Sequence, residues 1–227
     1  MKVLIYQQQL LAKIPQDDYQ EIKSHKADII CLPEYFFHPD FISYEDSISY
    51  MKQCSIDFDC IFIGGTTVFS ENGNNFNTCY IYNKGKEVGN YKKIHLFEPE
   101  VGKITPGSEY NVYNINNIKI GLLICADALY DEAWNSLSKL NPDIIFIPTF
   151  SPYKKENISD KFQRDEKIYV KGAKICDCYV VKVCCIGKFK TTQLQGRSLI
   201  ANKDGILWRV QPKNENDKII KTIEVNI

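Results

Sequence analysis

The stretch GLLICADALYDE, residues 121–132, joins an apolar run to an acidic segment through a single cysteine, Cys125. Residues 121–124 are typical of a buried strand, and free cysteine is itself among the most buried residue types. Asp131 and Glu132 suit the first turn of a helix, because the positive end of the helix dipole favours carboxylates there. A strand that passes into a helix in this way is a building unit of an α/β fold.

The same kind of short apolar run recurs along the chain. Strands are predicted where Val, Ile, Tyr and Phe cluster between Gly, Pro, Asn or Asp, at residues 3–6, 28–32, 60–64, 78–82, 119–124, 143–147, 179–185 and 198–202. Helical patterns occupy residues 17–26, 43–54, 131–140 and 159–176. Hairpins around residues 83–85 and 203–205 add antiparallel pairs. We therefore predict one α/β domain over residues 1–227, with mixed sheets.

The composition narrows the classes of partner. The chain has 227 residues, 44% of them hydrophobic, and its 28 basic residues balance its 28 acidic ones. This balance gives no electrostatic reason to expect nucleic acid or a membrane as a partner, so a small molecule is the expected ligand. The apolar run at residues 3–6 is too short for a signal peptide, and nine cysteines, several of them in strand-like segments, suit reduced thiols. We expect a cytoplasmic protein.

Two further strand-like segments carry reactive side chains. DIICLPEYFF, residues 28–37, places Glu34 just after an apolar strand that Pro33 ends. GNYKKIHLFEPE, residues 89–100, offers Lys93 and His95 on one face of an extended segment. Taken singly, Glu34 also fits a solvated loop, Lys93 a solvated basic edge and Cys125 a packed core thiol.

The joint occurrence of LPE, YKKIHL and GLLICAD in this order resembles the signature of the nitrilase superfamily, the carbon-nitrogen hydrolases. The resemblance covers most of the chain and implies a catalytic triad of Glu34, Lys93 and Cys125. It also implies a four-layer αββα sandwich, with helices outside two sheets, and a homodimer or larger homo-oligomer that packs helix layers together. No cofactor and no metal are expected.

The chemistry of these three residue types is consistent with that role. A free thiol is mostly protonated at neutral pH, because its pKa lies near 8.5. A carboxylate such as Glu34 can accept the thiol proton, and an ammonium such as Lys93 favours the anion. The backbone N–H of Ala126 could then stabilise an oxyanion. The matching family histidine is structural, so His95 is expected to pack rather than to act as a base.

Further site residues are expected beside the triad. A second glutamate often assists in the family, and Glu100 is the candidate, with Glu98 and Glu109 as rivals. The residues expected to contact substrate are Tyr35, Asp127, Thr149 and Phe150.

The residues after the nucleophile favour amides over nitriles as substrates. Cys125-Ala126-Asp127 keeps the aspartate of amide-cleaving members but lacks their aromatic residue. KKIHLFEPEVGKIT, residues 92–105, is especially similar to ω-amidase-type members, which act on monoamides of dicarboxylic acids. Arg164 and Arg197 are the two candidate partners for a distal carboxylate. A simple amide, an ω-amido acid, a carbamoyl compound and a nitrile all stay open as substrates.

The chain also departs from the family pattern. The helix at residues 159–176 has Gly172, Ala173, Ile175 and Cys176 where Arg-Ala and Glu-Asn pairs are usual, and Cys185 replaces a common asparagine. These departures keep a second hypothesis open, that of a non-catalytic binding protein on the same fold. A zinc module is a third hypothesis, because Cys176, Cys178, Cys184 and Cys185 cluster in the sequence, although zinc sites usually use Cys-x2-Cys spacing.

Overall fold

The computed structural model describes all 227 residues and contains two six-stranded sheets. The first sheet consists, in spatial order, of β14 (Ile219–Glu224), β1 (Lys2–Gln7), β2 (Ile29–Cys31), β3 (Ile61–Glu71), β4 (Asn74–Asn83) and β5 (Lys86–Lys92). The second consists of β13 (Gly205–Arg209), β12 (Leu199–Asn202), β9 (Tyr179–Cys184), β8 (Ile144–Thr149), β7 (Ile118–Leu122) and β6 (Val112–Ile115). A small ribbon pairs β10 (Lys188–Phe189) with β11 (Thr192–Gln193).

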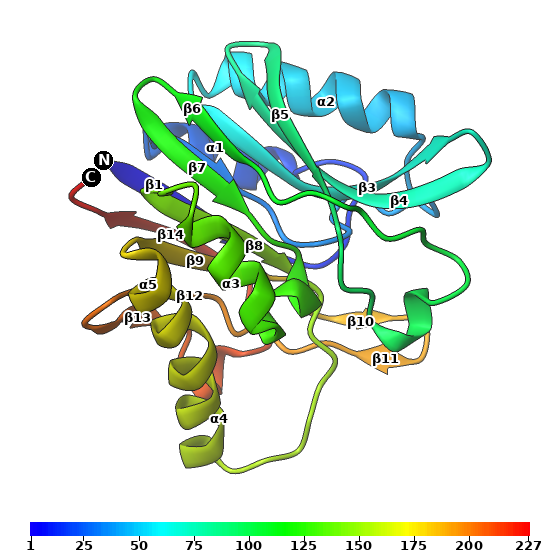
Figure 1. Cartoon of the computed structure of the whole chain (residues 1–227). Coiled ribbons are helices and arrows are strands. Elements are labelled where there is room, and N and C mark those ends of the chain that lie inside the picture. The colour runs from blue at the N-terminus through cyan, green and yellow to red at the C-terminus, as the bar shows by residue number, and fades with distance from the viewer.

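Both sheets are mixed, as predicted. The central strands β1, β2 and β3 pair in parallel, as do β7, β8 and β9, and the outer strands of each sheet pair antiparallel. The five helices are α1 (Gln16–Ser24), α2 (Tyr44–Asp57), α3 (Asp131–Ser138), α4 (Ile158–Asp165) and α5 (Lys171–Cys176). Figure 1 shows α1 and α2 outside the first sheet and α3 and α5 outside the second, which confirms the four-layer αββα sandwich.

The unbroken apolar runs of the central strands follow from this layering. Along β1, Val3 and Ile5 enter the core shared by the two sheets, whereas Leu4 and Tyr6 enter the core beneath α1 and α2. Because successive side chains of a strand point to opposite faces, a strand buried on both faces must be apolar at every position. The run VLIY therefore belongs in an inner strand of a layered sheet, and β1 lies between β14 and β2.

Two of the predicted elements, one strand and one helix, differ clearly from the structure. The strand predicted at residues 60–64 extends to Glu71, because Asn72 and Gly73 both have positive φ and form a tight hairpin turn into β4. The helix predicted at residues 159–176 contains a π-helical turn at Glu166–Val170, which separates α4 from α5. Such turns often occur at functional sites. No helix is both long enough and apolar enough to cross a membrane.

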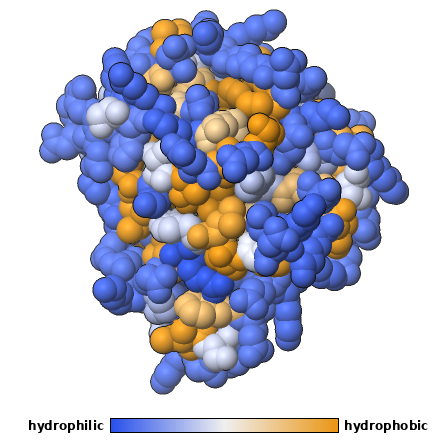
Figure 2. Space-filling model, turned by 90° about the vertical axis from the view of Figure 1, so that its left-hand side faces the viewer, coloured by the Kyte–Doolittle hydropathy of each residue, from blue (hydrophilic) through white to orange (hydrophobic).

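The surface carries exposed apolar side chains as well as polar ones. Figure 2 shows the face that lies at the left of Figure 1 and includes both chain ends, and apolar side chains gather along its middle with polar residues around them. Most of the surface in this view is hydrophilic.

Candidate functional site

Glu34 lies in the loop after β2 and is almost fully buried, with 1% of its surface exposed. Its Oε1 accepts hydrogen bonds from Lys93 Nζ at 2.7 Å and from Asn77 Nδ2 at 2.9 Å, and its Oε2 accepts one from the Phe150 backbone N–H at 2.7 Å. Burial raises the pKa of the Glu34 carboxyl, and the Lys93 ammonium only partly opposes this effect. A carboxylate with a raised pKa is a better proton acceptor than an exposed glutamate.

The position of the Glu34 loop depends on a glycine in the neighbouring strand. Gly65 has a φ of +65° at the irregularity in β3, and a Cβ there would lie 2.1 Å from the carbonyl oxygen of Pro33. Thr66 follows at once, and its Oγ1 accepts a hydrogen bond from the Tyr35 backbone N–H at 2.8 Å. The bulge in β3 therefore brings the chain on both sides of Glu34 into contact with the sheet.

Lys93 follows the end of β5 and lies between two carboxylates. Its Nζ donates hydrogen bonds to Glu34 Oε1 and to Glu100 Oε2, both at 2.7 Å, and only 1% of the residue is exposed. Burial alone would lower the pKa of Lys93, but Glu34, Cys125 in its thiolate form and Glu100 together raise it. Lys93 is therefore a permanently charged ammonium at the centre of the site.

Glu100 is the one of the three candidate second glutamates that reaches this site. Besides Lys93, it accepts hydrogen bonds from the Tyr35 hydroxyl at 2.6 Å and from the Phe97 backbone N–H at 2.8 Å. Burial opposes ionisation, but these contacts together hold the pKa of Glu100 below its usual value. Glu98 and Glu109 are exposed at the surface.

Asn77 connects the two glutamates, and sequence reasoning missed it. Its Nδ2 donates to Glu34 Oε1 and to Glu100 Oε1, both at 2.9 Å, and the side chain is fully buried. The amide oxygen of Asn77 has no hydrogen-bond partner. Rotation of the amide would bring that oxygen against two carboxylates, so the orientation is determined by electrostatics. A buried asparagine in the apolar strand NTCYIYN was the available signal.

Cys125 lies at the turn between β7 and α3, with a backbone φ of +46°. A positive φ is uncommon for a residue other than glycine and tends to occur at functional sites. The Sγ donates to the Phe150 carbonyl oxygen at 3.5 Å. Burial and the nearby Glu34 carboxylate raise the pKa of the Cys125 thiol, and Lys93 opposes this rise. The next residue, Ala126, has a backbone N–H without a hydrogen-bond partner and lines the same cavity as Cys125.

Asp127 lies beneath this turn and not in the cavity. It is fully buried, and its carboxylate accepts hydrogen bonds from the Tyr91 hydroxyl at 2.8 Å, the His95 backbone N–H at 2.7 Å and the Ile124 backbone N–H at 2.9 Å. These three donors leave no room for a substrate contact, so the expected substrate role of Asp127 does not fit its position. Its contacts instead connect the Lys93 segment to the Cys125 turn.

The remaining predicted residues surround the cysteine. Thr149, at the end of β8, and Phe150 line the cavity, and the backbone of Phe150 contacts both Glu34 and Cys125. The ring of Tyr35 packs edge-on against that of Phe150 at a centroid distance of 6.1 Å, while its hydroxyl is used by Glu100. His95 stacks on Tyr130 with ring centroids 3.8 Å apart, which agrees with the packing role expected for it.

The cavity beside Cys125 has a volume of about 470 Å³, within the range of small-molecule sites. Phe97, Leu129 and Tyr153 supply apolar surface, and Gln195 and Lys182 supply polar atoms. Both candidate arginines lie here as well. Arg164 pairs with Glu156, and Arg197 donates to Asp165 at 2.9 Å. Lys182, within the run YVVKVC, was not predicted from the sequence, although a lysine inside a buried strand is itself an unusual feature.

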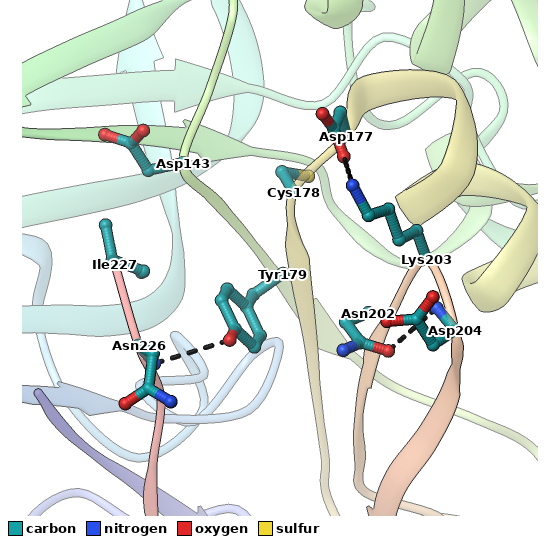
Figure 3. A pocket seen from close by; sticks show the side chains of 9 residues that line it. All are labelled: Asp143, Asp177, Cys178, Tyr179, Asn202, Lys203, Asp204, Asn226 and Ile227. Carbon is teal, nitrogen blue, oxygen red and sulfur yellow. Dashed lines mark hydrogen bonds and ion pairs between the residues drawn. The ribbon is translucent and has the colours of Figure 1, made fainter.

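A second hollow lies near the start of β9 and has different chemistry. Figure 3 shows the Lys203 ammonium paired with Asp177. The two charged side chains are largely exposed, and the pKa of the Cys178 thiol is raised by its contact with Cys176 and by burial. No group of three or more His, Cys, Asp or Glu side chains is arranged to hold a metal ion. The cavity at Cys125 is therefore the candidate active site.

Comparison with known proteins places the chain among related sequences. A family model described as carbon-nitrogen hydrolase matches residues 8–226. The 2-oxoglutaramate amidase of Bacillus subtilis is 24% identical over 219 residues, which cover 91% of this chain and 81% of that enzyme. Nitrilase homolog 2 of Dictyostelium discoideum is 28% identical over 149 residues, which cover 56% of this chain and only 45% of that protein.

A solved structure has the same fold. The amidase from Nesterenkonia sp. AN1, in a mutant form with acrylamide added to its active-site cysteine, aligns over 100% of this chain and 93% of its own, with a TM-score of 0.84. The sequence identity is 15%, so this likeness concerns the fold alone.

Proposed function

The chain belongs to the carbon-nitrogen hydrolase family, and on that premise we propose that it hydrolyses a small amide through a thioester on Cys125. One observation carries the proposal: Lys93 Nζ lies 2.7 Å from Glu34 and from Glu100, and Glu34 and Lys93 both act on the thiol of Cys125, the only cysteine that is half-buried rather than buried. A carboxylate, an ammonium and a thiol are costly to bury together unless each charge has its partner. Here each carboxylate is paired with Lys93, so the arrangement is suited to proton transfer.

In the first half of the proposed reaction, the amide carbonyl is attacked by Cys125. Glu34 accepts the thiol proton as the carbon–sulfur bond forms, because the raised pKa of its carboxyl favours uptake of a proton. Lys93 and the free N–H of Ala126 stabilise the oxyanion, and one such donor is typically worth about 3 kcal/mol. Glu34 then returns the proton to the nitrogen, the carbon–nitrogen bond breaks, and ammonia or an amine leaves.

In the second half, water replaces the amine. Glu34 accepts a proton from the water, the hydroxide adds to the thioester, and the carbon–sulfur bond breaks to release a carboxylic acid. Glu34 returns the proton to the departing sulfur, which restores the free thiol and the carboxylate. Glu100, paired with Lys93 and Tyr35, keeps the ammonium in place through both halves. We treat Glu100 as a positioning residue, because its carboxylate oxygens are occupied by these donors.

The experiment that tests the proposal is an ammonia-release screen over simple amides, ω-amido acids, carbamoyl compounds and nitriles. We expect turnover with at least one amide. Cys125→Ala, Lys93→Ala and Glu34→Gln should each abolish it, whereas His95→Asn should mainly lower the midpoint of thermal unfolding. Retention of turnover by Cys125→Ala would show that the mechanism is wrong, and turnover confined to nitriles would show that the substrate class is wrong.

A non-catalytic binding protein is the alternative, and thiol labelling distinguishes it. The other eight cysteines are buried, so exposure alone would make Cys125 the fastest to react. The useful comparison is therefore Cys125 labelling by acrylamide in the wild type and in Glu34→Gln. Removal of the Glu34 charge lowers the pKa of the Cys125 thiol in either case. An active site predicts that labelling nevertheless slows when the base is lost, and a binding protein predicts labelling that is as fast or faster.

We also propose a cytoplasmic location. All nine cysteines are free, and the pKa values of the buried thiols at Cys31 and Cys185 are raised by burial, so these thiols are unreactive. Such thiols are compatible with a reducing compartment. Localisation of a tagged chain would test this expectation.

A further inference from the structure

The wall of the Cys125 cavity contains a charged cluster that the proposed chemistry does not use. We call it the wall cluster. Its members Arg164, Asp165, Lys182 and Arg197 line the cavity, and its members Glu156, Lys161 and Glu215 are paired with them or with each other. Four members are cationic and three are anionic, so the cluster carries one positive charge that it does not neutralise itself.

The arginines of the wall cluster are already paired. Arg197 donates to Asp165 at 2.9 Å and to the Lys161 carbonyl oxygen at 3.0 Å, and Glu156 and Glu215 lie 3.4 and 3.7 Å from its guanidinium. Arg164 is paired with Glu156. Lys161 donates to both oxygens of Glu215, at 2.9 and 3.3 Å. Each of the three carboxylates in the wall cluster is therefore paired with at least one of these three cations.

Lys182 is the member left without a hydrogen bond. Its side chain is 5% exposed, and its nearest carboxylate oxygen, on Asp165, is 3.8 Å away, beyond hydrogen-bond distance. The ammonium lies 4.9 Å from the ring centroid of Tyr169, which supplies only a weak attraction. Because Lys182 lines the cavity and its nitrogen is not sealed in the core, an acceptor that enters the cavity can reach it.

The backbone presents this ammonium to the cavity that holds the nucleophile. Lys182 lies in the middle of β9, in parallel register with Ile147 of β8, and it lines the cavity together with Cys125 and Tyr169. Tyr169 belongs to the π-helical turn at Glu166–Val170, and the irregular turn places both Ile168 and Tyr169 at the cavity. The site thus has a reactive end at Cys125 and a cationic wall at Lys182.

We propose that Lys182 binds a carboxylate on the substrate, so that the amide hydrolysed at Cys125 belongs to a molecule with a free acid group. This inference rests on the proposed function and names its substrate class. The carboxylate would neutralise the surplus charge of the wall cluster and supply the missing acceptor for Lys182. Asp165 would keep its hydrogen bond from Arg197 throughout. Burial lowers the pKa of Lys182, but Cys184, Tyr169 and Asp165 raise it, so the net direction is upward.

The test compares two amides of the same chain length, succinamate with a carboxylate and butyramide without one. Wild-type protein should prefer succinamate in kcat/KM, and Lys182→Met should reduce that preference roughly tenfold or more, mainly through KM, since a hydrogen bond to a charged group is involved. Lys182→Arg should keep most of the preference. Lys203→Met, which removes a surface lysine at the second hollow, is the matched control and should change nothing.

A binding measurement separates this inference from the proposed function. Calorimetry with Cys125→Ala protein should show tighter binding of succinamate than of butyramide, and adding Lys182→Met should remove the difference, whether or not the wild type hydrolyses either compound. If the ammonia-release screen finds no amide that is hydrolysed but the binding difference is present, the proposed function fails and the role of Lys182 stands. An unchanged preference in Lys182→Met or Lys182→Gln, with both variants folded by circular dichroism, would overturn the assignment.

Discussion

At the scale of single residues, the site contains the charged groups of Glu34, Lys93 and Glu100. Asn77 contacts both carboxylates and fixes their positions. Glu34 and Glu100 both contact Lys93, and the Asn77 amide donates one hydrogen bond to each carboxylate. Without the Asn77 donor, the neighbouring carboxylates of Glu34 and Glu100 would repel each other more strongly and raise each other's pKa. We therefore assign Asn77 a positioning role that requires no contact with substrate.

Replacement of Asn77 by aspartate tests this role. Asn77→Asp removes the shared donor and adds a third carboxylate, so we expect kcat to fall by about tenfold or more with KM nearly unchanged. The acid limb of the pH profile should move to higher pH, because a like charge raises the pKa of Glu34. Asn135→Asp on the exposed face of α3 is the control. An unchanged profile in Asn77→Asp would refute the positioning role.

The pH dependence of the reaction follows from the environment of Glu34. Burial raises the pKa of this carboxyl, and the reaction needs its ionised form, so activity is lost as pH falls through the raised value. We expect the acid limb of kcat/KM above the ordinary glutamate pKa of about 4.3. Glu100→Gln removes a negative neighbour that raises the pKa of Glu34, so its limb should lie at lower pH. An acid limb of kcat/KM that lies at higher pH in Glu100→Gln than in the wild type would contradict this explanation.

At the scale of elements, the site depends on irregular features more than on regular ones. The bulge of β3 contacts the loop that carries Glu34, and Cys125 has a positive φ at the turn after β7. The π-helical turn places Tyr169 at the cavity. Asp127 then connects the Lys93 segment to the Cys125 turn through its three donors. The regular strands fix the position of the backbone, and the irregular positions determine where the side chains of the site lie.

Gly65 is the most sensitive of these irregular positions. Gly65→Ala forces a Cβ to 2.1 Å from the Pro33 carbonyl at a φ of +65°, so we expect a loss of about 2 kcal/mol or more in unfolding free energy, together with lower activity. Gly73→Ala is the matched control, because its φ is +78° but nothing lies within 4 Å of the new Cβ. It should cost only about 1 kcal/mol. Equal losses in denaturant titrations would show that the close contact is unimportant.

The sequence predicted the elements that local patterns determine. The strand ends before Glu34 and Cys125 and the extended segment around Lys93 could be predicted from local patterns, but the triad itself was named from the family resemblance, because each residue taken singly also fitted a non-catalytic role. Asn77 and Lys182 lie inside strands, and their roles arise from partners distant in the sequence, such as Glu34, which is 43 residues from Asn77. The π-helical turn was also missed, because its apolar spacing resembles that of a continuous helix.

At the scale of the whole molecule, the site lies between the two sheets. Glu34 and Lys93 follow strands of the first sheet, and Cys125 follows a strand of the second. Their geometry therefore depends on the packing of one sheet on the other, through a core of 34 buried residues. A homodimer or larger homo-oligomer, expected from the family resemblance, remains a proposal, and so does a single domain over residues 1–227.

The central claim is that Cys125, supported by groups from the other sheet, carries the acyl group during turnover. The most direct test is mass spectrometry of protein quenched in acid while it hydrolyses an amide identified by the ammonia-release screen. We expect an acyl mass increment on the peptide that contains Cys125 in the wild type, and neither increment nor turnover in Cys125→Ala. Steady turnover with an unmodified Cys125 peptide, or with the acyl group on another residue, would contradict it.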